Sequence, residues 1–310
     1  MHFLSFIWNP SEGIDLGFFV IRYYSLMFVI AFTLGWIITK KIFIREGETL
    51  DKLDSLFIYM VVAILLGARL GHVLFYQSEL IFEDPISIFL PFRTVPEFEF
   101  TGFTGLASHG AAIGVIIAMF MFSKKVLKKN ILWILDRVVI AVASGAIFVR
   151  IGNFLNSEII GKAVNGDFPL AVKFIRNTIS KYEVTQITGI KDVNKAYHAL
   201  ETDPQFAETL ANIPFSHPAQ MYESIGYVFV FIILWMIYWK TEKRKQLGYI
   251  FGAFLVLLWT VRFFVEFVKK SQGGFESDLG NLLSTGQWLS IPFIIAGLYF
   301  MFRSSKKIIS

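Results

Sequence analysis

Five arginines, and no lysine, lie within long apolar stretches of this 310-residue chain. They are Arg22, Arg69, Arg137, Arg150 and Arg262. Arginine stays charged in apolar surroundings, and its planar guanidinium matches phosphate oxygens with two parallel hydrogen bonds. Several such groups around a wet cavity could hold a phosphate and stabilise one that departs. The alternative is structural, because a long arginine near a helix end can reach the lipid headgroups, and Arg137 stands beside Asp136.

Polar side chains of other types accompany all of these arginines except Arg137. They are Tyr24, His72, His109, Asn153, Asn156, Glu158, Gln220, Tyr222, Glu223, Glu266 and Gln287. The amides can bind phosphate or hydroxyl groups without adding charge, and Glu266 could orient Arg262, which is one helical turn away. The glutamates could instead only pair helices, and the tyrosines could be ordinary interface aromatics. If the apolar stretches span a membrane, this spacing favours an enzyme or a transporter that acts on an anionic lipid.

The composition identifies the apolar stretches as membrane spans. Hydrophobic residues make up 55% of the chain, charged residues 17%, and the mean hydropathy is +0.58. Soluble domains carry roughly 25% charged residues, so the composition excludes a soluble protein. Cysteine is absent, which excludes disulfides, cysteine-ligated metals and a cysteine nucleophile from this chain. The net charge of +5 is typical of cytoplasmic loops, and no nucleic-acid partner is predicted.

Seven apolar runs predict an all-α, polytopic membrane protein that forms a single membrane domain over residues 1–310. The runs cover about 18–39, 53–75, 106–123, 131–151, 218–239, 247–267 and 286–302. No basic segment or small-residue cleavage site precedes the first run, so it is interpreted as a retained helix. No zinc, phosphate-loop or dinucleotide motif is present, and neither a metal nor a diffusible cofactor is predicted.

The placement of basic residues predicts the orientation of the spans. Fifteen lysines and arginines follow the first, third, fifth and last runs, whereas the short connections on the other side carry three. This places the N-terminus outside, the C-terminus in the cytoplasm, and all the intramembrane arginines except Arg137 in the outer layer. Residues 76–105 are predicted to form an external interfacial segment. Residues 162–217 are too polar to span and are predicted to form an external cap, in which Lys191–Leu210 could be helical.

Several motifs around the polar residues match those of one family. The stretch from Val149 to Gly161 reads V-R-I-G-N-F-L-N-S-E-I-I-G and resembles the signature of prolipoprotein diacylglyceryl transferases. Further matches, in family order, are I-R-Y-Y at 21–24, G-A-R-L-G-H-V-L-F-Y at 67–76, H-G and I-G at 109–110 and 113–114, H-P-A-Q-M-Y-E at 217–223, R-F-F-V-E-F (family pattern R-F-x-x-E-F) at 262–267, and G-Q-W-L-S-I-P at 286–292. Ala111 departs from the family, which has a second glycine after the histidine.

The resemblance implies both a reaction and a location. Members of this family move the diacylglyceryl group of phosphatidylglycerol to the thiol of the lipobox cysteine, just after the signal sequence of a preprolipoprotein. Glycerol phosphate leaves, and this is the first step of bacterial lipoprotein modification. The implied partners are therefore phosphatidylglycerol, the preprolipoprotein signal-peptide segment and the lipid bilayer. The implied location is the bacterial cytoplasmic (inner) membrane, with the active site towards the outer leaflet.

The resemblance also assigns roles to named residues. Arg150 and Arg262 are predicted to grip the phosphate and stabilise the leaving group, and His109 is either the base for the thiol or a headgroup contact. The predicted substrate-binding residues are Tyr24, Arg69, Gly110, Arg150, Asn153, Asn156, Glu158, Gly161, Gln220, Tyr222, Glu223, Glu266 and Gln287. Gly110 and Gly161 are predicted to allow tight turns or a close approach of the backbone to the lipid.

Two other classes of function compete with the transferase. A lipid transporter would need polar residues along a path through the whole bilayer. Here the inner halves of the runs are almost entirely apolar apart from Asp54 and the Asp136–Arg137 pair. An intramembrane protease would need a nucleophile motif with a histidine, or paired aspartates, and the sequence contains neither pattern.

Overall fold

The computed structural model describes residues 5–17, 20–90, 92–94, 97–100, 105–271, 274 and 282–303. The chain divides into two compact units, a larger one with residues 1–35 and 139–310 and a smaller one with residues 36–138. Helices α1 (Tyr23–Arg45) and α5 (Ile131–Leu155) each begin in one unit and end in the other. A single membrane domain over the whole chain stays a prediction.

The helices of both units have the length and composition of membrane spans. Six helices are long and apolar enough to cross a bilayer: α1, α2 (Leu50–Tyr76), α4 (Ser108–Phe122) with its π-helical extension η2 (Ser123–Leu127), α5, α10 (Ala219–Lys240) and α12 (Thr285–Phe302). Helix α11 (Tyr249–Val265) is also apolar, and its 17 residues are at the lower limit for spanning. The chain is therefore a multi-pass, all-α membrane protein, as the apolar runs predict. The orientation of the spans stays a prediction.

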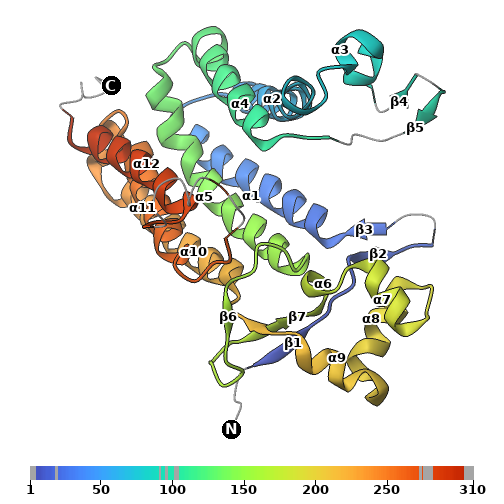
Figure 1. Cartoon of the computed structure of the whole chain (residues 1–310). Coiled ribbons are helices and arrows are strands. Elements are labelled where there is room, and N and C mark those ends of the chain that lie inside the picture. Colours follow the sequence, from blue (N-terminus) through green and yellow to red (C-terminus); the bar gives the residue numbers. More distant parts are fainter. Residues whose placement is uncertain are drawn as a thin grey trace. The chain divides into compact units, whose positions relative to one another are not determined.

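In the smaller unit, α2 and α4 lie side by side because glycines face each other (Figure 1). A Cβ atom on Gly71 would lie 2.5 Å from the Cα atom of Gly110, and one on Gly110 would lie 2.3 Å from the carbonyl oxygen of Gly67. Without a hydrophobic driving force between membrane helices, small residues permit the close packing that holds them together. Gly110 is therefore buried in a helix contact, and its predicted role of allowing a tight turn or a close approach of the backbone to the lipid stays a prediction.

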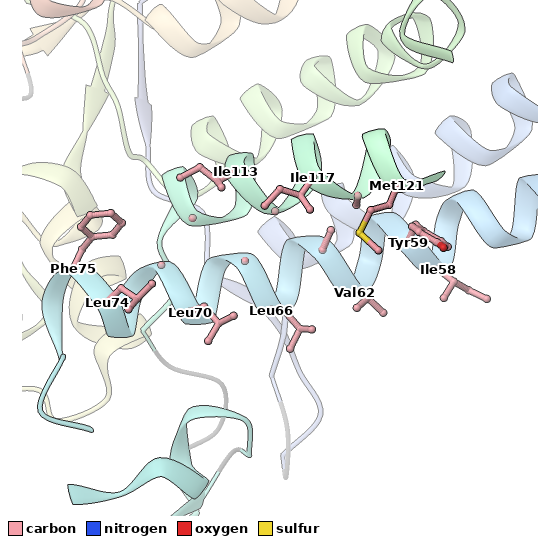
Figure 2. A pocket seen from close by; sticks show the side chains of 16 residues that line it. Ile58, Tyr59, Val62, Leu66, Leu70, Leu74, Phe75, Ile113, Ile117 and Met121 are labelled. Carbon is pink, nitrogen blue, oxygen red and sulfur yellow. The ribbon is translucent and has the colours of Figure 1, made fainter. Parts of the chain in front are cut away.

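An apolar groove of about 600 Å³ follows the same two helices. Figure 2 shows Leu66, Leu70 and Leu74 of α2 and Ile113 and Ile117 of α4 along its walls. These side chains are between 38% and 61% exposed. Such a surface is stable in a bilayer because hydrocarbon covers it.

In the larger unit, residues 162–217 fold into a small mixed structure, named the cap here. Its four-stranded sheet has the order β1-β7-β8-β6 and contains β1 (Phe6–Trp8), β7 (Val172–Phe174), β8 (Phe215–Ser216) and β6 (Ala163–Val164). Strand β1 comes from the N-terminus and runs parallel to β7, and the other pairs are antiparallel (Figure 1). The N-terminal segment is thereby fixed to the cap.

The helical part of the cap has its own apolar core. It contains α6 (Ile175–Thr178), α7 (Lys181–Thr188), α8 (Val193–Thr202), η3 (Pro204–Phe206) and α9 (Ala207–Asn212). The core is formed by Ile175, Ile179, Val184, Ala196, Tyr197, Leu200 and Ile213. The Ser180 side chain and the Glu183 side chain form a reciprocal cap at the start of α7, which fixes where this helix begins. The predicted helical stretch Lys191–Leu210 is thus mostly helical.

The strand pair β2 (Gly13–Asp15) and β3 (Val20–Arg22) leads directly into α1.

Helices α11 and α12 lie side by side in Figure 1 at a second glycine contact. A Cβ atom on Gly252 would lie 2.6 Å from the carbonyl oxygen of Gly297, and one on Gly297 would lie 2.7 Å from that of Gly252. This contact places the last turn of α11, which carries Arg262, beside the start of α12.

Candidate functional site

Arg150 lies near the end of α5 and pairs with a buried carboxylate of α10. Its Nε atom is 2.6 Å from Oε2 of Glu223, and the two side chains are 13% and 0% exposed. The other oxygen of Glu223, Oε1, is buried and accepts no hydrogen bond from any residue that the structure describes. Such a carboxylate is costly to bury unless it is paired, so Arg150 and Glu223 stabilise each other. The pair also fixes the direction of the guanidinium.

A chain of hydrogen bonds extends from Arg150 to the turn after α5. Arg150 Nη1 donates to Oδ1 of Asn153 over 3.2 Å, and Nδ2 of Asn153 donates to Oε1 of Glu158 over 2.7 Å. Gln220 Nε2 on α10 donates to the carbonyl oxygen of Glu158 over 2.6 Å. Asn153 and Gln220 are buried. The network therefore connects two membrane helices and the turn that follows one of them.

The turn that carries Glu158 has a strained backbone. Ser157 and Ile159 have φ angles of 55° and 60°, in the left-handed region that a β-branched residue such as Ile159 rarely adopts. Each such residue costs about 1–3 kcal/mol and persists only where its surroundings hold it. Here the hydrogen bond from Gln220 and the bond from the Glu158 N–H to the Asn153 carbonyl hold the turn. This conformation points the Glu158 carboxylate back towards Asn153.

Tyr227 links Arg150 to the second predicted catalytic arginine. The Arg150 guanidinium donates a hydrogen bond to the Tyr227 hydroxyl, which also interacts electrostatically with Arg262 and Glu223. Tyr227 is only 3% exposed. The Arg262 guanidinium lies over the Trp259 ring, with Cζ 5.4 Å from the ring centroid. Its buried Nε atom has no hydrogen-bond partner among the described residues, so this arginine keeps a donor available.

Tyr24, at the start of α1, belongs to the same network. It hydrogen-bonds Asn153 and interacts electrostatically with Glu158 and Arg150. A Cβ atom on Gly152 would lie 2.8 Å from the Tyr24 ring. Glycine at 152 therefore lets the ring lie directly against α5, where its hydroxyl reaches the polar cluster.

Glu266 and Gln287 have structural partners that differ from the prediction. Glu266 Oε1 is 2.8 Å from Nζ of Lys269, and Oε2 accepts from the Ser284 hydroxyl over 3.1 Å. No ion pair joins Arg262 to Glu266 within the described residues, although the Glu266 N–H donates to the Arg262 carbonyl oxygen over 3.0 Å, because the Glu266 carboxylate is directed to Lys269 and Ser284 instead. Gln287 caps the start of α12 through Ser284, and its amide donates to the carbonyl oxygen of Phe263 over 3.3 Å.

Three further predicted residues lie where the cap joins the membrane helices. The Tyr222 hydroxyl is 3.3 Å from Nδ1 of His217, and burial lowers the pKa of His217 below its ordinary value. A Cβ atom on Gly161 would lie 2.5 Å from the Cβ atom of His217. Gly161 thus allows two backbone segments to pass closely, as predicted for a tight approach, although its neighbour is protein. Asn156 is exposed at the end of α5.

In the smaller unit, the guanidinium of Arg69 donates hydrogen bonds to the backbone. Its Nε and Nη2 atoms donate to the carbonyl oxygens of Ile88 and Ser87 over 3.1 and 2.8 Å. These carbonyls belong to η1 (Pro85–Ile88), in the segment after α2 that also contains α3 (Leu80–Glu83) and the strand pair β4 (Phe92–Arg93) and β5 (Glu99–Phe100). These donors therefore hold this segment in place, and the predicted part of Arg69 in substrate binding stays a prediction.

His109 is exposed at the start of α4, where its ring meets the edge of the Phe75 ring at a centroid distance of 5.0 Å. His72 stacks on Tyr76 at 5.4 Å. Neither ring contact shows whether the imidazole of His109 takes up a proton during the reaction. Both of its predicted roles, base and headgroup contact, stay predictions.

Among the described residues, no three His, Asp or Glu side chains gather closely enough to hold a metal ion.

Comparison with known proteins agrees with the motifs. A family model described as prolipoprotein diacylglyceryl transferase matches residues 12–303. The chain belongs to the prolipoprotein diacylglyceryl transferase family. Three relatives carry the name phosphatidylglycerol–prolipoprotein diacylglyceryl transferase. That of Tolumonas auensis is 33% identical over 301 residues, which are 97% of this chain and 98% of the relative. That of Bacteroides fragilis is 35% identical over 307 residues (98% and 97%), and that of Porphyromonas gingivalis is 34% identical over 294 residues (93% and 90%).

In this diacylglyceryl transferase family member, one cluster contains half of the predicted site residues of the larger unit. Arg150, Asn153, Glu158, Gln220 and Glu223 contact one another, and Tyr24 joins them, as described above. The sequence analysis missed Tyr227, which accepts a hydrogen bond from Arg150 and interacts electrostatically with Arg262. The available signal was its position one helical turn after Glu223, which places both side chains on the same face of α10.

Proposed function

We propose that this chain transfers the diacylglyceryl group of phosphatidylglycerol to the thiol of a lipobox cysteine in a preprolipoprotein. The observation that carries this proposal is the buried cluster in which Tyr227 joins Arg150, Glu223 and Arg262. Family membership supplies the reaction class. The cluster supplies the groups that such a reaction needs, namely two guanidiniums in fixed positions at the ends of apolar helices.

The reaction makes one bond and breaks one bond. The thiol sulfur bonds to the terminal glyceryl carbon of the lipid, and the bond between that carbon and the phosphate oxygen breaks. The oxygen keeps the electron pair, so a phosphate diester with one negative charge becomes a glycerol phosphate with two. The thiol proton passes to a base or to solvent, and a thioether remains on the protein substrate.

The charges of the cluster suit this change. Arg150 and Arg262 carry two positive charges, and Glu223 and Glu158 carry two negative charges, so the ionised groups of the network nearly balance before a lipid binds. The lipid phosphate brings a single negative charge to the two guanidiniums. As the second negative charge develops, the attraction to both guanidiniums grows. Groups that bind the departing phosphate more strongly than the substrate accelerate the reaction.

The thiol must lose its proton, because the thiolate is the reactive nucleophile. His109 is the candidate base, and its alternative role is a hydrogen bond to the lipid headgroup. A His109→Gln variant separates these roles. Loss of the base lowers kcat and removes the acidic limb of the pH profile, whereas loss of a headgroup contact raises KM and keeps the profile.

We also propose that the chain lies in the bacterial cytoplasmic membrane with the Arg150 cluster towards the outer leaflet. The support is the excess of lysine and arginine in the connections at the opposite ends of the spans. This orientation places the cluster on the side where a lipobox cysteine emerges after its signal sequence crosses the membrane. The predicted external positions of residues 76–105 and of the cap follow from the same orientation.

One reconstitution tests the activity. The purified full chain is placed in phosphatidylglycerol vesicles with a peptide that carries a signal helix and a lipobox cysteine. We expect glycerol phosphate release and a peptide heavier by one diacylglyceryl group, both lost when serine replaces the peptide cysteine. Vesicles of phosphatidylethanolamine provide the lipid control. Movement of phosphatidylglycerol between leaflets without any release would instead support a lipid transporter.

A further inference from the structure

A second polar cavity lies beside the Arg150 cluster, within the larger unit. Its volume is about 200 Å³, and its walls include Arg22, Asn156, Glu158, Arg176 and Lys181. Asn156 and Glu158 come from the turn after α5, whereas Arg176 and Lys181 come from the cap. At about 30 Å³ for each water, the volume corresponds to six or seven waters, which is enough for a small polar ligand and too small for a lipid with its chains.

Two of the cations in this cavity keep their charge uncompensated by direct contacts. Arg176 donates to the neutral oxygens of Asn9 and Asn194 over 2.8 and 3.1 Å, and its guanidinium lies 4.4 Å from the centroid of the Tyr197 ring. Glu12 and Glu201 act on Arg176 only through space. The neutral partners therefore hold the guanidinium in place without cancelling its charge.

Arg22 is the second such cation. Its side chain is exposed, and no carboxylate pairs with it in the part of the chain that the structure describes. Of the remaining wall charges, Lys181 and Glu12 compensate each other, since Lys181 Nζ is 2.6 Å from Oε1 of Glu12, whereas Glu158 keeps its negative charge and accepts a hydrogen bond from the neutral Asn153. With Glu12, the ionised wall groups number three cations and two anions, so the cavity is charged to attract an anion.

The cavity is connected to the reaction centre through a shared side chain. Glu158 forms part of its wall and accepts from Asn153, which accepts from Arg150. Arg22 and Arg176 thus line a cavity that shares Glu158 with the hydrogen-bond network of Arg150. The N–H groups of these two arginines can replace the hydrogen bonds that water donates to a hydrated anion.

We propose that this cavity is the exit site for glycerol phosphate, which it holds after the transfer and before release from the cap. This inference rests on the proposed transferase function. Glycerol phosphate carries two negative charges and several hydroxyl groups, whereas the intact headgroup carries one negative charge and two acyl chains. The polar walls and the small volume therefore favour the product over the substrate. Weak binding of glycerol phosphate in this cavity also explains how the doubly charged product dissociates from Arg150 and Arg262 without the help of another protein.

The test is product inhibition in the vesicle assay. Racemic glycerol phosphate is added to wild-type enzyme and to the Arg176→Gln and Arg22→Gln variants, with Lys195→Gln as the matched control because this lysine is exposed on the cap but lies outside the cavity. We expect the inhibition constant to rise about threefold to tenfold in the two arginine variants and to stay unchanged in the control. We expect KM for phosphatidylglycerol to stay within about twofold of wild type.

A second measurement is independent of turnover. The line width of the phosphorus NMR signal of glycerol phosphate is recorded with each variant of the solubilised full chain, and broadening by the wild type should weaken in both arginine variants. An increase in KM for the lipid without a change in the inhibition constant would assign the cavity to the headgroup and overturn the proposal. Unchanged inhibition and unchanged broadening in both folded variants would also overturn it. If wild-type enzyme releases no glycerol phosphate, the transferase function fails, and the NMR measurement alone decides whether the cavity binds a phosphate monoester.

Discussion

Helix α5 carries two arginines with opposite surroundings. Arg137 is 1% exposed, and its Nη2 atom is 3.0 Å from Oε1 of Glu46. Its Nη1 atom donates to the Trp133 carbonyl oxygen over 3.2 Å, and its guanidinium lies over the ring of the same tryptophan. Arg150 is 13% exposed and shares a polar cluster with Glu223, Asn153 and Tyr227.

The difference separates a structural arginine from one that can bind a ligand. The protein encloses Arg137 completely, whereas Arg150 faces an environment that keeps part of its guanidinium accessible. The partners of Arg150 also carry other polar contacts, so a phosphate can enter an existing network. One residue type on one helix thus serves stability at one end and, by the proposal above, chemistry at the other.

The largest effect on stability is expected at Arg137. An Arg137→Met variant leaves Glu46 without its partner, and breaking a buried pair in this way costs about 3–5 kcal/mol. The apparent melting temperature in detergent should fall strongly, while kcat per folded enzyme stays near wild type. In the double variant with Glu46→Met, part of the loss should return, because the Glu46 carboxylate is removed as well; Asp136, whose Oδ2 atom is 3.9 Å from Nη1 of Arg137, still loses that guanidinium, so the recovery should be incomplete. A large fall in kcat at an unchanged melting temperature would contradict the structural role.

The opposite pattern is expected at the two cluster arginines. Arg150→Lys and Arg262→Lys keep the positive charge but lose the planar fork that binds two phosphate oxygens. We expect kcat for glycerol phosphate release to fall about 10²–10³-fold, with a melting temperature close to wild type. Near-wild-type activity of Arg262→Lys would remove this residue from the catalytic role. If both variants failed to fold, Arg150 would be needed for stability as Arg137 is, and the proposed difference between the two arginines of α5 would be wrong.

Smaller effects should follow from the residues that position Arg150. Glu223→Gln removes the charge that pairs with its Nε atom, and hydrogen bonds to charged groups are worth about 1.5–3 kcal/mol, so kcat should fall about 10- to 100-fold. Tyr227→Phe removes only one hydroxyl, and we expect about a threefold to tenfold fall. In both variants KM should change less than kcat. A Tyr227→Phe enzyme with a larger defect than Glu223→Gln would reverse the assigned order.

The sequence predicts the membrane helices and the members of the Arg150 cluster well, because both depend on local patterns. The apolar runs are long, and Arg150 and Asn153 are three residues apart on one helix, as are Gln220 and Glu223 on another. The sequence does not show that Glu223 reaches Arg150. That contact requires α5 and α10 to pack together, which the hydrogen bond from Ser224 to the Ile147 carbonyl reports.

Other contacts of the predicted site residues could not be read from the sequence. Arg262 and Glu266 are one turn apart, but the Glu266 carboxylate is directed to Lys269. Backbone carbonyls 18 and 19 residues after Arg69 accept from its guanidinium, and its part in substrate binding stays a prediction. Helix ends and carbonyl directions depend on tertiary structure, so residue type and spacing alone do not predict them.

The smallest effect is expected at His217, where the cap meets the helix that carries Glu223. Burial lowers the pKa of its imidazole from the unfolded value of about 6.5, so the folded protein favours the neutral ring. The contribution to stability is therefore complete above pH 6.5 and is lost as the pH falls through the folded-state pKa. We expect less than about 1.4 kcal/mol, the value of one pKa unit.

The measurement compares melting temperatures of wild type and His217→Gln from pH 5 to pH 8. Glutamine keeps a polar group near the Tyr222 hydroxyl but does not titrate, so the wild-type curve should fall relative to the variant only below about pH 6.5. A constant difference across the range would mean that His217 acts only through packing against Phe168, whose ring lies 4.7 Å away. A relative gain in wild-type stability at low pH would reverse the sign and show that the folded state favours the charged imidazole. Because His217 contacts neither Arg137 nor Arg150, this variant should leave the contrast between the two ends of α5 unchanged.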